Sequence, residues 1–140
     1  MERHSIPAVA RNRAIDGNTL LYTVAFFETF KLFKMVSSII INSKLFLDKI
    51  SNKENHFHTF KMDVHSMDSK GFGTLELINS KNTYATISNV KCENPFEWKI
   101  QNILLIRDLH RLLSSLKSQD VKVYFTEDSL CVKSIFEITR

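Results

Sequence analysis

The stretch that decides the fold is residues 96–138, which read FEWKIQNILLIRDLHRLLSSLKSQDVKVYFTEDSLCVKSIFEI. Apolar and charged side chains alternate in its first five residues, which predicts a half-buried strand. Leucines then recur at helical spacing from Leu105 to Leu116, so the period changes from two residues to about 3.6. Alternation resumes over 121–126 and, after a polar turn, over 130–138. The stretch therefore predicts a strand, an amphipathic helix over 102–117 and a hairpin.

The side of this predicted helix that lies opposite the leucines is basic. Arg107, Arg111 and Ser114 lie within about 60° of one another at 100° per residue, and Lys117 follows them. Such a stripe attracts phosphate groups, but an ordinary solvated helix face also carries exposed Arg and Lys. No aromatic residue is interleaved with the stripe, which argues against the stacking of single-stranded bases.

Composition indicates one folded domain. Of the 140 residues 44% are hydrophobic, which is enough apolar area for one core, and we expect a flexible arm over 1–18 followed by a single domain over 19–140. The formal net charge of +4 permits an anionic partner without requiring one. Two cysteines, Cys92 and Cys131, do not form a disulfide framework and favour a reducing intracellular compartment.

An apolar run follows the predicted arm and favours a first helix. Thr19 can cap this helix, which we expect to continue to about Ser37. Its apolar residues surround nearly the whole circumference, so the helix is either buried on most sides or covers a partner surface. Lys31 and Lys34 would form a narrow basic strip on it. With Glu28, these charges argue against a membrane-spanning helix, and we predict soluble core instead.

The middle of the chain reads as a series of strands. A β-branched run over 39–41 predicts a strand that continues to 47, and alternation predicts further strands over 60–64, 72–78 and 84–90. The order of helix, strands, helix and two strands indicates an α+β fold. We expect a mostly antiparallel sheet with two helices packed on one face.

Four residues in or near the strand predicted over 60–64 invite a metal interpretation: His56, His58, Asp63 and His65. The His-x-His spacing places two imidazoles on one side of a strand. Structural zinc, however, takes four ligands, and the nearest cysteine, Cys92, is far along the chain. We therefore predict exposed strand-face histidines and no metal or other cofactor. Neither a phosphate-binding loop nor a nucleophile motif occurs, so the sequence predicts no enzymatic activity.

The order of elements and the amino-acid sequence of the second half resemble one domain of the sliding DNA clamps. This is the family of proliferating cell nuclear antigen and the checkpoint clamp subunits. The likeness is carried by Phe96-x-Trp98-x-Ile100, the leucine-rich helix, the hairpin over 120–130 and the strand pair over 73–77 and 84–87. It covers about residues 57–138. Clamp subunits join two or three such domains, whereas 140 residues hold one. The polar segment 51–55 and so apolar a first helix also depart from the family pattern.

The resemblance implies a non-catalytic, clamp-like platform for DNA replication or repair in the nucleus, joined to partner subunits or to copies of itself and with no membrane contact. It implies that five helix-borne cations face the backbone of duplex DNA: Lys31, Lys34, Arg107, Arg111 and Lys117. Cations on rigid helices attract phosphate without reading bases. A different class stays open, namely an assembly subunit of a larger complex that binds no nucleic acid.

Overall fold

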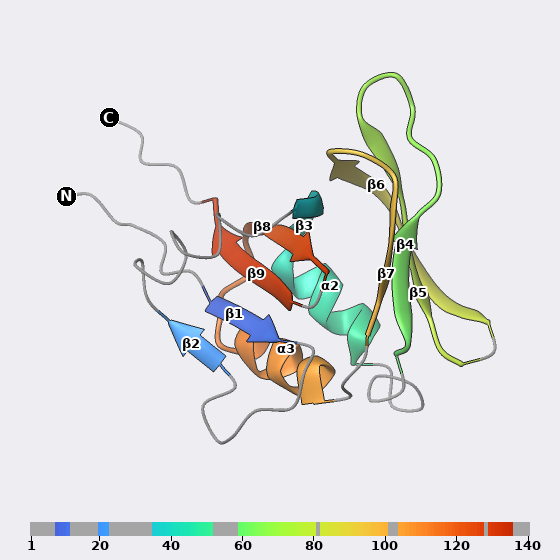
Figure 1. Cartoon of the computed structure of the whole chain (residues 1–140). Helices are drawn as coiled ribbons and strands as arrows, with labels where there is room; N and C mark the ends of the chain where they lie inside the picture. The colour runs from blue at the N-terminus through green and yellow to red at the C-terminus, as the bar shows by residue number, and fades with distance from the viewer. Residues whose placement is uncertain are drawn as a thin grey trace, which may run out of the picture.

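The computed structural model describes residues 8–11, 20–22, 35–51, 59–80, 82–100, 104–127 and 129–135 (Figure 1). These segments contain the strands β1 (Ala8–Arg11), β2 (Leu20–Tyr22), β3 (Met35–Asn42), β4 (Lys61–Val64), β5 (Phe72–Ile78), β6 (Thr83–Cys92), β7 (Phe96–Lys99), β8 (Asp120–Thr126) and β9 (Ser129–Ser134). All pair antiparallel in one nine-stranded sheet of order β2-β1-β9-β8-β3-β6-β5-β4-β7. The helices α2 (Ser43–Ile50) and α3 (Leu104–Ser114) pack against each other and against the sheet. The predicted α+β class, with two helices on one face of an antiparallel sheet, is confirmed.

The order of elements repeats within the chain. The units β3-α2-β4-β5 and β7-α3-β8-β9 each consist of a strand, a helix and an antiparallel hairpin. The two units also pair with each other, because β3 pairs with β8 and β7 pairs with β4. Each half thus extends the sheet of the other, and the topology has the reciprocal form of a pseudo-two-fold repeat.

Helix α3 buries the side that the leucine spacing predicts. Leu105 and Leu109 are fully buried and Leu112 is 4% exposed, whereas Leu116 lies beyond the helix and is half-buried. The helix ends at Ser114, so its predicted extension to 117 is wrong; residues 101–103 lie outside the described residues. The early end has a local cause. The hydroxyls of Ser114 and Ser115 donate 2.7 Å hydrogen bonds to the carbonyls of His110 and Leu112, in competition with backbone N–H groups.

The prediction of a first helix over 19–37 is wrong wherever the structure describes that segment. Leu20–Tyr22 is strand β2 and Met35–Asn42 is strand β3, while 23–34 lie outside the described residues. Strand β3 lies between β8 and β6 in the interior of the sheet. Its side chains Ile39 and Ile41 are buried, whereas Ile40 between them is partly exposed, as the two-residue period of a strand requires.

The continuation of the β3 strand to 47 is also wrong, because helix α2 begins at Ser43. The side-chain oxygen of Asn42 accepts a 3.0 Å hydrogen bond from the Leu45 N–H and so caps the helix. Phe46 and Ile50, four residues apart, are both fully buried. The β-branched run ends where this cap and this spacing begin.

Part of the predicted loose arm belongs to the sheet. Within 1–18, Ala8–Arg11 forms β1, which pairs with β9 on one side and with β2 on the other. The remainder of 1–18 lies outside the described residues, as does most of the polar segment 51–55.

Candidate functional site

Helix α3 presents its predicted cations to solvent. Arg107 and Arg111 are exposed one turn apart on the side opposite the buried leucines, and Lys117 is exposed just beyond the helix. Arg111 lies near a buried carboxylate, because its Nη1 is 3.8 Å from Oδ1 of Asp108. Asp108 is only 4% exposed, so this ion pair holds one guanidinium nitrogen of Arg111 near the helix, although 63% of the Arg111 side chain stays exposed.

Helix α2 adds a cation that the sequence interpretation misses. Lys44 is exposed on the side of α2 that lies away from Phe46 and Ile50. The sequence pattern favours a strand for this segment, and a strand would not place Lys44 beside the basic stripe. Since α2 and α3 pack against each other on one face of the sheet, their solvent sides form one surface, which we call the helix face.

The helix face is predominantly basic. Among the described residues of α2, of α3 and of the turn that follows α3, the exposed charged side chains are Lys44, Asp48, Arg107, Arg111 and Lys117. The other two predicted cations, Lys31 and Lys34, lie outside the described residues.

The opposite face of the sheet carries a row of acids. Met62 and Val64 of β4 point into the core, so Asp63 between them points to the other face. The strand register places Asp63 opposite Glu76 of β5 and opposite Glu97 of β7. Lys61 of β4 forms an ion pair with Glu97.

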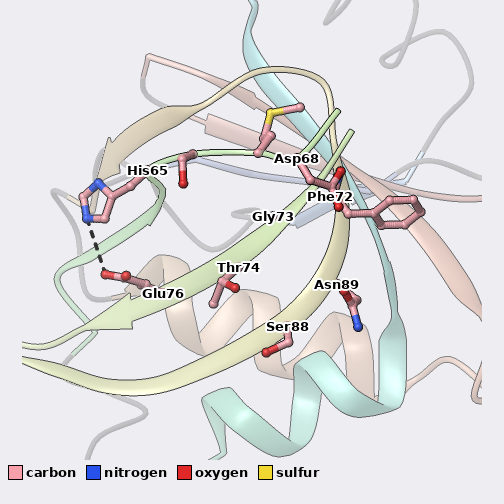
Figure 2. A pocket seen from close by; sticks show the side chains of 10 residues that line it. His65, Asp68, Phe72, Gly73, Thr74, Glu76, Ser88 and Asn89 are labelled. Carbon is pink, nitrogen blue, oxygen red and sulfur yellow. Dashed lines mark hydrogen bonds and ion pairs between the residues drawn. The ribbon is translucent and has the colours of Figure 1, made fainter. Parts of the chain in front are cut away.

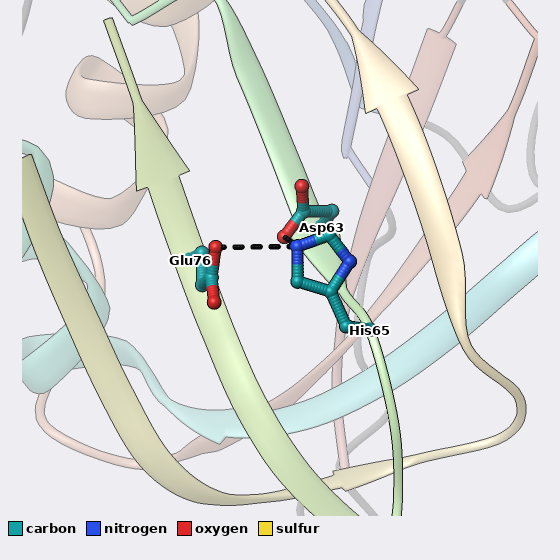
Figure 3. Close-up of side chains that lie close together, drawn as sticks. All are labelled: Asp63, His65 and Glu76. Atoms are coloured by element: carbon teal, nitrogen blue, oxygen red, sulfur yellow. Dashed lines mark ion pairs between the residues drawn. The ribbon is translucent and has the colours of Figure 1, made fainter. Parts of the chain in front are cut away.

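Asp63 lies in a cluster with His65 and Glu76 (Figure 3). Nε2 of His65 is 3.5 Å from Oδ1 of Asp63 and 3.5 Å from Oε1 of Glu76. Asp63 has no exposed surface, and neither of its carboxylate oxygens has a hydrogen-bond partner among the described residues. Burial raises the pKa of Asp63, His65 opposes that shift, and the carboxylate of Glu76 adds to it.

The structure brings together two of the four residues of the metal interpretation. Asp63 is fully buried although it alternates with the apolar Met62 and Val64, whereas His65 is exposed as predicted. Glu76 escapes the sequence interpretation because only the pairing of β4 with β5 brings it to Asp63. His56 and His58 lie outside the described residues.

A polar hollow of about 560 Å³ adjoins the cluster (Figure 2). Its lining includes His65, Asp68, Phe72, Gly73, Glu76 and Asn89. Gly73 is required at this place, because a Cβ atom there would lie 2.7 Å from the carbonyl oxygen of Ser66. Asn89 has a φ of 59°, in a stretch where the register of β6 against β5 shifts. A bulge in the sheet therefore shapes one side of the hollow.

A scan against models of known protein families finds no match, and a search of curated protein sequences finds no significant similarity. Among the described residues, no helix has the length and apolar character needed to cross a membrane.

Proposed function

We propose that the chain is a clamp-like module that lies along the backbone of duplex DNA with its helix face, as a non-catalytic platform for replication or repair in the nucleus. The observation that carries this proposal is the reciprocal pairing of two strand–helix–hairpin units, β3 with β8 and β7 with β4. That topology supports the resemblance to one domain of the sliding clamps, and it brings both helices to one face of the sheet.

The charges of the helix face fit a phosphate backbone. Four exposed cations, Lys44, Arg107, Arg111 and Lys117, stand on this face against one exposed carboxylate, Asp48, among the described residues. Duplex DNA carries one negative charge per about 1.7 Å of its axis, so a helix-borne group of cations meets phosphates at any position along it. Such contacts hold the protein on DNA without reading its sequence.

A salt-dependent binding experiment tests the proposal. We would titrate the full chain against two duplexes of unrelated sequence at two salt concentrations, and compare it with the double variant Arg107→Glu/Arg111→Glu. The double variant should weaken binding to both duplexes alike. The slope of log affinity against log salt should also flatten by roughly one unit for each phosphate that the variant no longer neutralises.

A matched control reverses two charges on the other side of the sheet. Lys70 lies in the turn before β5 and Lys91 near the end of β6, and both are exposed. Lys70→Glu/Lys91→Glu changes the net charge by the same amount as the arginine variant, yet it should retain most of the affinity. Equal losses of affinity in the two double variants would show attraction to net charge alone. A parent chain that binds neither duplex at low salt would remove the proposal.

A second candidate is an assembly subunit that binds no nucleic acid, and the end of the sheet favours it. In the described part of the sheet β7 has one neighbour, β4, so its other edge can pair with another chain. Phe60, which precedes β4, is 42% exposed. The apolar helix predicted over 19–37 could have offered a partner surface. It does not support this candidate over 20–22 and 35–37, because these residues form strands. A solution mass above that of one chain, together with no affinity for DNA, would favour this second function.

A further inference from the structure

We propose that Asp63, His65 and Glu76 form a binding site for a divalent transition-metal ion, with zinc as the natural occupant. This site lies on the face of the sheet opposite the helix face, and it does not depend on DNA binding. Figure 3 shows the three side chains converging from β4, from the segment that follows it and from β5.

Asp63 is a buried carboxylate that lacks compensation. Its side chain has no exposed surface, and neither oxygen has a hydrogen-bond partner among the described residues. Such a carboxylate is costly unless a cation or hydrogen-bond donors stabilise its charge. Lys61, the nearest basic residue on the same strand, is already paired with Glu97. Among the described residues, His65 is the group that forms an ion pair with Asp63, and it is charged only when it is protonated.

The donor atoms of the cluster are spaced as zinc requires. Zinc binds nitrogen and oxygen ligands at about 2.0–2.2 Å, so two ligands of a tetrahedral site lie about 3.3–3.6 Å apart. Nε2 of His65 lies 3.5 Å from Oδ1 of Asp63 and 3.5 Å from Oε1 of Glu76. All three donor atoms lie within 4.8 Å of one another. A small rotation of Glu76, which is partly exposed, closes the third edge of the tetrahedron around the fixed Asp63.

The donor types select the metal. An imidazole nitrogen with two carboxylates suits zinc and its neighbours in the first transition row, whereas calcium and magnesium prefer oxygen ligands alone. Three protein ligands leave the fourth position of a tetrahedral zinc ion open to water. Water can reach the cluster from the polar hollow, because His65 and Glu76 also line it (Figure 2). The ion would neutralise Asp63 and tie β4 to β5 across their register pair.

Metal titration of the full chain tests the site. Zinc-free protein should bind one equivalent of Zn²⁺ at this site by calorimetry, and Co²⁺ should produce the visible absorption of a tetrahedral complex. His65→Ala removes an exposed ligand that the fold does not need, and Glu76→Gln removes a second. Each should lower the zinc affinity by at least about tenfold. Groups that only orient a metal ligand already have effects of about tenfold to a hundredfold.

Two control variants separate this site from adventitious binding. Glu127→Gln removes an exposed carboxylate at the end of β8, outside the cluster, and His56→Ala/His58→Ala removes two other imidazoles; both should bind zinc like the parent. Zinc should raise the midpoint of thermal unfolding in the parent and in Glu127→Gln but not in His65→Ala. If His65→Ala does not fold, Glu76→Gln decides the matter.

The proposal is overturned by a parent chain that binds no zinc, which would leave a plain ion pair between His65 and the two carboxylates. It is equally overturned if His65→Ala and Glu76→Gln retain the parental zinc affinity, or if the loss of affinity appears in His56→Ala/His58→Ala instead.

Discussion

The indole N–H of Trp98 donates a buried 2.6 Å hydrogen bond to the backbone carbonyl of Thr126. Trp98 lies on β7 and Thr126 ends β8, two strands that are far apart in the order of the sheet. The Trp98 ring also packs on Phe125, with ring centroids 5.0 Å apart. The sheet therefore curls around the core until its last strand contacts β8 through side chains.

Replacing Trp98 tests this contact. Trp98→Phe keeps an aromatic ring but leaves the buried Thr126 carbonyl without its donor, which should cost about 1–3 kcal/mol. Trp98→Ala also creates a cavity and should cost about 3–5 kcal/mol. Urea unfolding measures both. If Trp98→Phe were as stable as the parent, the hydrogen bond would contribute nothing to closing the sheet.

Leu109 tests the packing of α3. It is fully buried, so Leu109→Ala should lower the free energy of unfolding by about 2–5 kcal/mol. Arg107→Ala, a truncation on the exposed side of the same helix, should stay within about 0.5 kcal/mol of the parent. The two values would be similar only if α3 did not turn its leucines to the core.

The elements that the sequence predicts well are those whose signal is local. Helix α3 and the strands β5 and β8 follow from periodicities within a few residues, and the alternation in 96–99 marks β7. The strand predicted over 39–41 is confirmed as part of β3, whereas the helix predicted to continue to about Ser37 is wrong over 35–37, because the apolar run before Ile39 has no clear period. The pairing of β3 with β8 and β6 extends the strand to Met35, and that pairing is not local.

The candidate sites divide in the same way. Arg107 and Arg111 are predictable because both lie on one helix whose spacing is visible in the sequence. Lys44 is not, because the signal that starts α2, Asn42 as a cap and Phe46 with Ile50 at helical spacing, is weaker than the preceding β-branched run. Glu76 reaches Asp63 through strand register, which no spacing in the sequence encodes.

Cys131 should be an unreactive thiol. Burial raises its pKa to about 12, so the thiolate that attacks disulfide reagents is nearly absent at pH 8. In a Cys92→Ala background, Cys131 should react slowly in the native protein and quickly in denaturant. Because the unfolded thiol ionises near its ordinary pKa of 9.0 and the folded one does not, stability should also fall as the pH rises from about 9 towards about 12. Rapid native-state labelling at pH 8 would contradict this.

Asp68 should make the turn before β5 sensitive to acid. Its Oδ1 accepts hydrogen bonds from the N–H groups of Phe72 at 3.0 Å and Lys70 at 2.9 Å, and these bonds lower its pKa. A lowered folded-state pKa means that the stabilisation is complete above the ordinary pKa of 3.8 and is lost as the pH falls through the folded value. The stability difference between the parent and Asp68→Asn should therefore be present at neutral pH and shrink in acid. A difference that does not change with pH would show that the carboxylate charge has no role in the turn.

The last prediction concerns Lys44, the cation that only the structure places on the helix face. If α2 and α3 lie along one DNA backbone together, Lys44→Glu should weaken binding to unrelated duplexes alike and flatten the salt slope by about one unit, for the one phosphate left unneutralised. The weaker binding cannot come from unfolding, because Lys44 lies in the first turn of α2, where the helix dipole disfavours a cation and favours Glu by about 0.3–1 kcal/mol. Asp48→Lys, on the same helix, should instead strengthen binding. Unchanged DNA affinity in Lys44→Glu, alongside weakened binding in Arg107→Glu/Arg111→Glu, would confine the DNA interface to α3.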